Sequence, residues 1–161
     1  MVSLISKVQE WLIMNNKFKT LFEYLFLFFV GGSIYYIIET LYKGVTKGKS
    51  SHWSMFILGG ICFIAIGLIN QFYITWDMLL VKQMIIGACI ITILEFITGC
   101  IVNLNLGWNV WDYSHLPLNV LGQICLPFSF MWFFLSGVAI LLDDYIRYKL
   151  FNEEKPHYYF K

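Results

Sequence analysis

Four long runs of apolar residues alternate with short polar segments along this chain. The runs cover Leu21–Leu41, Trp53–Phe72, Gln83–Val102 and Leu121–Leu142. A helix needs about 20 mostly apolar residues to cross a bilayer, and each run reaches that length. A transmembrane β-barrel would instead show segments of about 10 residues with alternating polarity. The pattern therefore predicts an all-α membrane protein, a bundle of about four transmembrane helices.

The first 19 residues show a different pattern, because their apolar positions recur with the period of a helix. One helical face carries Leu4, Ile5, Val8, Trp11 and Leu12. This predicts an interfacial amphipathic helix over 1–19, ahead of a transmembrane domain over 20–145 and a cytoplasmic tail over 146–161. A partly ordered N-terminal tail is the alternative.

Composition supports the membrane class. The chain has 161 residues, of which 59% are hydrophobic and only 13% are charged. A soluble domain has about 45–50% apolar and about 25% charged residues. These values exclude a soluble enzyme, a disordered protein and a nucleic-acid binder. They indicate an integral membrane protein, whose partner is the lipid bilayer. The net charge of +1 indicates no further partner.

The distribution of basic residues predicts the orientation. With four spans both termini share one side, and that side holds eight of the eleven Lys and Arg residues: Lys7, Lys17, Lys19, Lys82, Arg147, Lys149, Lys155 and Lys161. The other side holds Lys43, Lys47 and Lys49. Because basic residues favour the cytoplasmic side, we expect a multi-pass protein of the cell membrane with both termini in the cytoplasm.

Motifs for catalysis or cofactor binding are absent from the sequence. The segment 44–50 resembles a phosphate-binding loop, but it lacks one residue between its glycines and follows a membrane helix instead of a strand. The cysteines lack the paired spacing of a zinc site. We therefore predict no catalytic residue, no metal, no cofactor and no ATP hydrolysis by this chain itself. A disulfide between Cys100 and Cys125 is open but not favoured.

Two carboxylates lie within the apolar runs away from their cytoplasmic ends, Glu39 in the first and Glu95 in the third, whereas Glu23 is close enough to the end of the first run to reach the headgroups. A charged residue at the centre of a span costs about 2.5–3.5 kcal/mol on insertion scales, so such residues are candidate functional sites. Spans one and three cross the bilayer in the same direction, which places both carboxylates toward the non-cytoplasmic side. Glu95 lies roughly 10 Å from the end of its run at 1.5 Å per residue. Structural hydrogen bonds within the helix packing are the alternative role.

Small residues near these carboxylates favour close helix packing. The candidates for helix packing are Gly31, Gly32, Gly59, Gly60 and Gly99. Because Glu95 has no Lys or Arg within a helical turn, we expect it to be uncharged or to accept hydrogen bonds. The candidate donors are Tyr35, Tyr36, Trp108, His115 and Gln123.

The segment 107–123 is rich in aromatic residues and has no Lys or Arg. It is predicted to form either an interfacial aromatic belt with a tight turn, or a re-entrant or lid-like loop over the helices. Together with the spans it completes a predicted polar cluster of Glu39, Glu95, Asn103, Trp108, Trp111, Asp112, Tyr113, His115, Asn119 and Gln123.

Two further expectations concern the last span. Pro127 is expected inside the fourth helix, where it would kink the helix or free a carbonyl. Asp143 and Asp144 are expected at a solvated helix end near Arg147.

The sequence resembles the small membrane proteins called putative ABC-transporter type IV, or putative ABC transporter permeases. The resemblance rests on Gly31-Gly32 with Glu39, on Glu95-Phe-Ile-Thr-Gly99, on Trp111-Asp-Tyr-Ser114, and on Pro117-Leu-Asn119 with Gly122-Gln-Ile-Cys-Leu126 and Trp132. It covers about residues 25–140. Many members have Arg where this chain has Gln123. The resemblance implies a transport permease.

Three functions fit these observations. The first is a permease component that lacks its own ATPase and works as a homo-oligomer, with other membrane subunits or with a separate ATPase. The second is a non-transporting membrane protein that assembles with or regulates a larger membrane complex. The third is an intramembrane enzyme with Glu95 or Asp112 and His115 as acid and base.

Overall fold

The computed structural model describes residues 2–71 and 78–160, and this part of the chain is helical with no strand. The elements are α1 (Val2–Lys47), α2 (Trp53–Gln71), α3 (Leu80–Gly99), a π-helical segment η1 (Cys100–Asn105) that continues α3, and α4 (Leu126–Leu150). Within them Met14–Thr46, Trp53–Gln71, Leu80–Asn105 and Leu126–Leu150 are long and apolar enough to cross a membrane. The prediction of an all-α protein with four helices long and apolar enough to span a membrane is confirmed. Phe72, the predicted end of the second span, lies outside the described residues.

The last helix begins later than predicted. Residues 121–125 belong to the preceding loop, and α4 starts at Leu126 with Pro127 in its first turn. The prediction that Pro127 kinks the interior of the span was therefore wrong. Proline is favoured in the first helical turn because the backbone N–H that it lacks has no helical partner there. Pro127 thus sets the start of α4.

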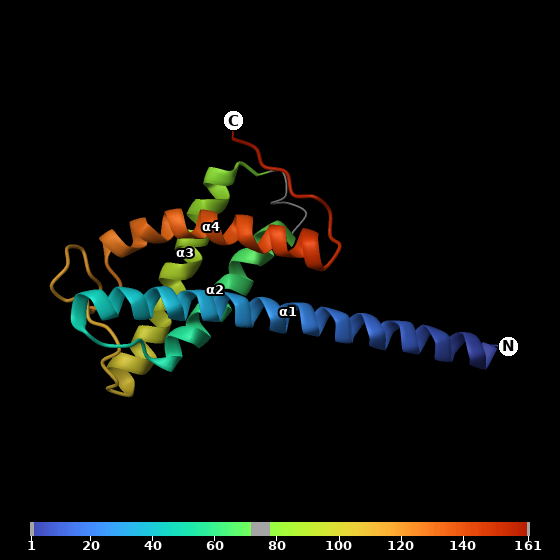
Figure 1. Ribbon diagram of the computed structural model, residues 1–161, viewed down its shortest axis with the longest axis horizontal. Coiled ribbons are helices and arrows are strands. Elements are labelled where there is room, and N and C mark those ends of the chain that lie inside the picture. Colours follow the sequence, from blue (N-terminus) through green and yellow to red (C-terminus); the bar gives the residue numbers. More distant parts are fainter. Residues whose placement is uncertain (1, 72–77, 161) are drawn as a thin grey trace.

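The N-terminal segment joins the first span without a break. Helix α1 runs continuously over 46 residues, and its N-terminal half extends beyond the other helices (Figure 1). At 1.5 Å per residue it is roughly 70 Å long, about twice the hydrocarbon thickness of a bilayer. Residues 2–19 are thus helical, as expected, but they are not a separate helix. Their position relative to a membrane interface stays a prediction.

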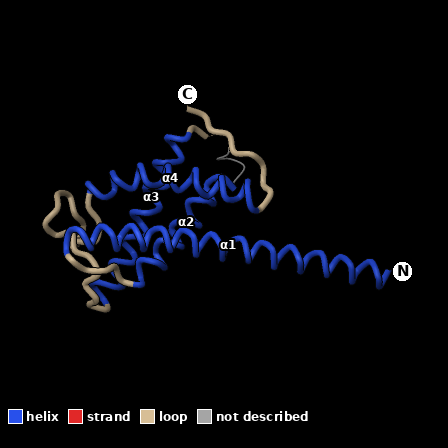
Figure 2. The backbone as a smooth tube through the Cα atoms, in the orientation of Figure 1, coloured by secondary structure: helices blue, strands red, loops and turns tan. Residues whose placement is uncertain are grey.

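The connections gather at the two ends of the bundle (Figure 2). At one end the 48–52 loop meets the long 106–125 loop, where the ring of Trp108 lies 5.0 Å from that of His52. At the other end the C-terminal tail returns to the start of α3, and the backbone N–H of Leu80 donates to the carbonyl of Tyr159 at 2.9 Å. Successive helices therefore alternate in direction, as four spans require.

Glycines allow α1 and α2 to pack closely. Four glycines at this contact each face an aromatic residue of the other helix: Gly31 faces Phe63, Gly32 faces Phe56, Gly59 faces Tyr35 and Gly60 faces Phe28. A Cβ added at Gly60 would lie 2.6 Å from the ring of Phe28, which no real contact permits. Inside a membrane the hydrophobic effect contributes little to helix association, and small residues allow the helix backbones to approach closely and pack. The predicted packing positions on these helices thus lie where two helices meet.

Candidate functional site: a groove between the first and last helices

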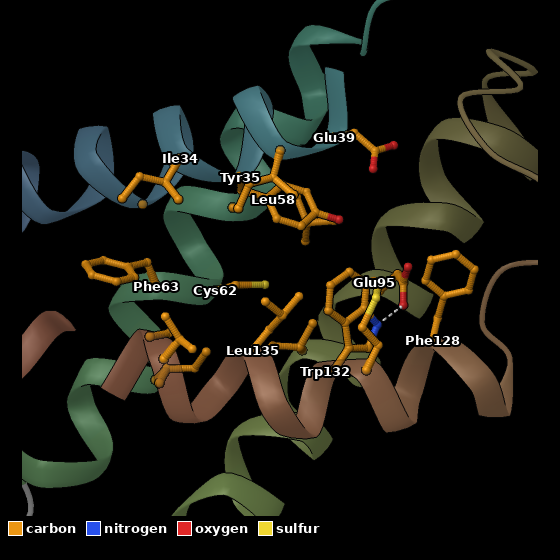
Figure 3. A pocket seen from close by; sticks show the side chains of 18 of the residues that line it. Ile34, Tyr35, Glu39, Leu58, Cys62, Phe63, Glu95, Phe128, Trp132 and Leu135 are labelled. Carbon is orange, nitrogen blue, oxygen red and sulfur yellow. Dashed lines mark hydrogen bonds between the residues drawn. The ribbon is translucent and has the colours of Figure 1, made fainter. Parts of the chain in front are cut away.

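A cavity of about 320 Å³ lies between α1 and α4, with α2 and α3 behind it (Figure 3). Its walls are mostly apolar and aromatic, and they include Tyr35, Phe63 and Trp132. Glu39 of α1 and Glu95 of α3 both line it. The expectation from span direction, that these carboxylates approach the same side, agrees with this placement. The groove therefore combines a hydrophobic wall with acidic groups at one end.

Glu95 is held by two hydrogen bonds from different parts of the chain. Its side chain is only 1% exposed. The indole Nε1–H of Trp132 in α4 donates to Oε2 at 2.8 Å, and the hydroxyl of Tyr113 in the loop donates to Oε1 at 3.0 Å. Each carboxylate oxygen thus has a donor, which offsets much of the penalty of burying it. The expected hydrogen bonding is present, but its donors are not any of the five predicted.

Glu39 has a cationic partner of its own. Its Oε1 lies 2.8 Å from Nζ of Lys43, one helical turn further along α1. The same ammonium donates to the backbone carbonyl of Val110 at 3.0 Å. Lys43 therefore neutralises Glu39 and fastens the 106–125 loop to α1. A lysine four positions after a glutamate on a helix is a recognisable ion-pair spacing.

The helix containing Glu95 extends further than predicted. The π-helical turn carries α3 on to Asn105, so Glu95 lies ten residues, or roughly 15 Å, from its end. A π-helical turn shifts the side chains that follow it, and such turns are frequent at functional sites. Here it directs Asn103 into the loop. Glu95 is consequently farther from the end of its helix than the apolar run indicated.

Asn103 organises the loop by using both ends of its amide. Its Nδ2 donates to the carbonyl of Trp111 at 3.1 Å and to Oε1 of Gln123 at 2.8 Å, while its Oδ1 accepts from the N–H of Val110 at 2.7 Å. The indole of Trp111 donates to the carbonyl of Gln123 at 2.9 Å. Trp111 is buried, and its ring and Gln123 pack against Gly99 of α3. The loop is thus folded onto the helices and fixed by its own polar residues.

The remaining predicted residues lie on the outside of this loop. Asp112 accepts from the N–H of Ser114 at 2.8 Å, and Asn119 donates to the carbonyl of Leu116 at 2.9 Å. Asp112 and His115 are exposed, whereas Glu95 is buried. Trp108 is half-exposed beside His52 and Trp53. Of the ten predicted residues, Glu39, Glu95 and Tyr113 line the groove. Asn103, Trp111 and Gln123 are buried where the loop meets α3, and the other four lie on the outside of the loop.

A second buried polar network occupies the opposite end of the bundle. Arg147 Nε lies 2.6 Å from Oδ2 of Asp143, and both side chains are almost fully buried. Asp144 accepts from Asn70 Nδ2 at 2.7 Å and from the hydroxyl of Tyr158 at 2.8 Å. The expectation of a solvated helix end was wrong, because α2 and the C-terminal tail cover these carboxylates. The i, i+4 spacing of Asp143 and Arg147 was the signal for an ion pair in the last span.

The structure contains no disulfide between Cys100 and Cys125, the alternative left open by the sequence. Cys62, Cys89, Cys100 and Cys125 are all free. Among the described residues, no group of three or more His, Cys, Asp or Glu side chains is placed to hold a metal ion. The polar groups that line the groove are carboxylates, tyrosine hydroxyls, an indole and the thiol of Cys62. Carboxylates and aromatic faces bind cations, and carboxylates and hydroxyls accept hydrogen bonds.

Comparison with known families agrees with the resemblance seen in the sequence. A family model described as putative ABC-transporter type IV matches residues 26–158. The chain belongs to the putative ABC-transporter type IV family. The matched region contains the groove, the 106–125 loop and the network around Arg147. No solved structure matches this chain.

Proposed function

We propose that this protein of the putative ABC-transporter type IV family is the membrane-embedded component of a transport permease, and that the groove between α1 and α4 is its substrate site. One observation carries the proposal: carboxylates from two different helices line one cavity at membrane depth. Ionisable residues inside a membrane are costly, and they mark substrate and ion pathways. The cavity also falls within the 300–1,000 Å³ range of small-molecule sites.

The proposed orientation has both termini in the cytoplasm. Lys82, Arg147, Lys149 and Lys155 lie at the end of the bundle opposite Lys43 and Lys49, and this asymmetry supports a cytoplasmic placement of the first end. The 106–125 loop then covers the groove from the non-cytoplasmic side as a lid. Its exposed apolar residues, Leu118, Val120 and Leu121, would rest at the membrane interface.

A separate ATPase would drive transport, because this chain has no nucleotide-binding motif of its own. Affinity purification of the full-length protein from its native membrane, after gentle solubilisation, tests this. We expect a stoichiometric ATPase subunit among the retained proteins. A stable membrane complex that contains no ATPase would contradict the permease role. That result would favour the second function, an assembly or regulatory subunit.

A further inference from the structure

The groove opens sideways, between the two helices that form its rim. Ile38 on α1 and Val138 on α4 line it, and their side chains are 47% and 61% exposed. Both residues lie within the membrane-spanning segments. A molecule that reaches the groove by this route comes from the bilayer. Its bulk must therefore be apolar.

Only one of the two carboxylates at the acidic end of the groove has a compensating cation. Glu39 and Glu95 line the cavity, and among the described residues that line it there is no Lys or Arg. The nearby ammonium of Lys43 is already engaged by Glu39 and by the carbonyl of Val110. One carboxylate thus faces the groove without a basic partner. This excess of negative groups complements a positive charge and disfavours an anion.

Aromatic side chains surround the same end. Tyr35, Tyr42, Tyr113, Phe128 and Trp132 all line the cavity. The hydroxyl of Tyr35 points into the space between the two glutamates (Figure 3). Aromatic faces attract cations, and the attraction is strongest where water is excluded. Organic cations with a dispersed charge suit such a site better than small hydrated ions, whose dehydration is costly.

We infer that the groove between α1 and α4 binds a lipophilic organic monocation, with its apolar body between the helices and its charge between Glu39 and Glu95. This inference rests on the proposed function, because it names the substrate class of the same site. The ligand enters from the bilayer, and its positive charge supplies the basic partner that Glu95 lacks.

Binding of tetraphenylphosphonium to the full chain in nanodiscs tests the inference directly. Tetraphenylborate has nearly the same shape and the opposite charge, so it controls for partition into lipid, as do empty nanodiscs. We expect saturable binding of the phosphonium and none of the borate. Equal binding of the two ions, or no saturable phosphonium binding, would overturn the inference.

Variants locate the site. Glu39→Gln and Glu95→Gln should each weaken phosphonium binding by about tenfold, because each removes a charged partner. Glu23→Gln is the matched control, since Glu23 lies on α1 beside Lys19 and away from the groove. Val138→Trp should block the groove, whereas Phe134→Trp places the same ring on the outside of α4. Unchanged affinity in both glutamine variants and in Val138→Trp would overturn the inference.

This assay uses the purified chain without any ATPase. A chain that copurifies with an ATPase but does not bind the phosphonium leaves the permease role intact and removes the ligand class. A chain that binds the phosphonium through both glutamates but has no ATPase partner keeps the site and removes the permease role.

Discussion

Trp132 donates its indole N–H to Glu95 across 2.8 Å, and this bond ties the last span to the only carboxylate of the third. Tyr113 completes the arrangement by reaching the same carboxylate from the 106–125 loop. Glu95 is therefore the point at which two helices and the loop meet. Its replacement should affect the packing of all three.

Two substitutions separate the hydrogen-bonding role of Glu95 from its charge. Glu95→Gln keeps the shape and an acceptor for Trp132, so the thermal unfolding temperature should stay close to that of the wild type. Glu95→Leu leaves the buried indole N–H of Trp132 without an acceptor and should lower stability by about 1–3 kcal/mol. Thermal unfolding of the purified proteins, followed by circular dichroism, measures both. A Leu variant as stable as the wild type would show that the hydrogen bonds do not hold the site together.

Arg147 should be essential for stability, although it lies far from the groove. Arg147→Met leaves Asp143 buried without its partner, and breaking a buried ion pair in this way costs about 3–5 kcal/mol. Replacing both partners, as in Asp143→Leu with Arg147→Met, should recover part of the loss. Lys149→Met is the control, because Lys149 is exposed on the same helix. Equal unfolding temperatures for the Arg147 and Lys149 variants would contradict this account of the network.

The glycines of the α1–α2 contact should tolerate no side chain. Gly59→Ala places a methyl group against the Cβ of Tyr35, and overpacking of this kind costs about 1–3 kcal/mol. Gly44→Ala, on the same helix as Tyr35, meets nothing within 4 Å and should be neutral or slightly stabilising. Unfolding temperatures of the two variants give the comparison. If Gly59→Ala unfolded at the same temperature as the wild type, α1 and α2 would not pack as closely as described.

Membrane topology gives another prediction. Single cysteines at Lys49 and Ser114, in a cysteine-free background, should react with an impermeant maleimide applied to intact cells. A single cysteine at Glu154 should react only after the cells are opened. Labelling of Lys49 and Ser114 from opposite sides would refute four spans. Labelling of Glu154 alone in intact cells would keep the four spans and invert the orientation.

The helical architecture follows directly from the sequence, because long apolar runs have few alternatives in a bilayer. The placement of Glu39 and Glu95 toward the same side of the membrane was also predictable, since it depends only on the number of spans. The exact ends of the helices were harder to predict. The π-helical turn at Cys100–Asn105 extends α3 with backbone hydrogen bonds between residues five positions apart, and no residue pattern predicts this change.

The partners of the polar residues could not be derived from the sequence. Trp132 lies 37 positions after Glu95 on another helix, and only the crossing of α3 and α4 brings the two side chains together. Asp143 and Arg147 gave a local signal through their spacing. Their burial, however, depends on α2 and on the tail that carries Tyr158. Sequence analysis thus identified the carboxylates at the groove but not their hydrogen-bond donors.

An experimental structure of the full chain in lipid nanodiscs with bound tetraphenylphosphonium tests most directly whether the groove between α1 and α4 is the functional site. We predict density for the cation between these helices, with its charge beside Glu39 and Glu95, and Glu95 in hydrogen-bond contact with Trp132 and Tyr113. Glu95 facing open lipid with no polar neighbour, or α1 packed directly against α4 with no space between them, would contradict the account.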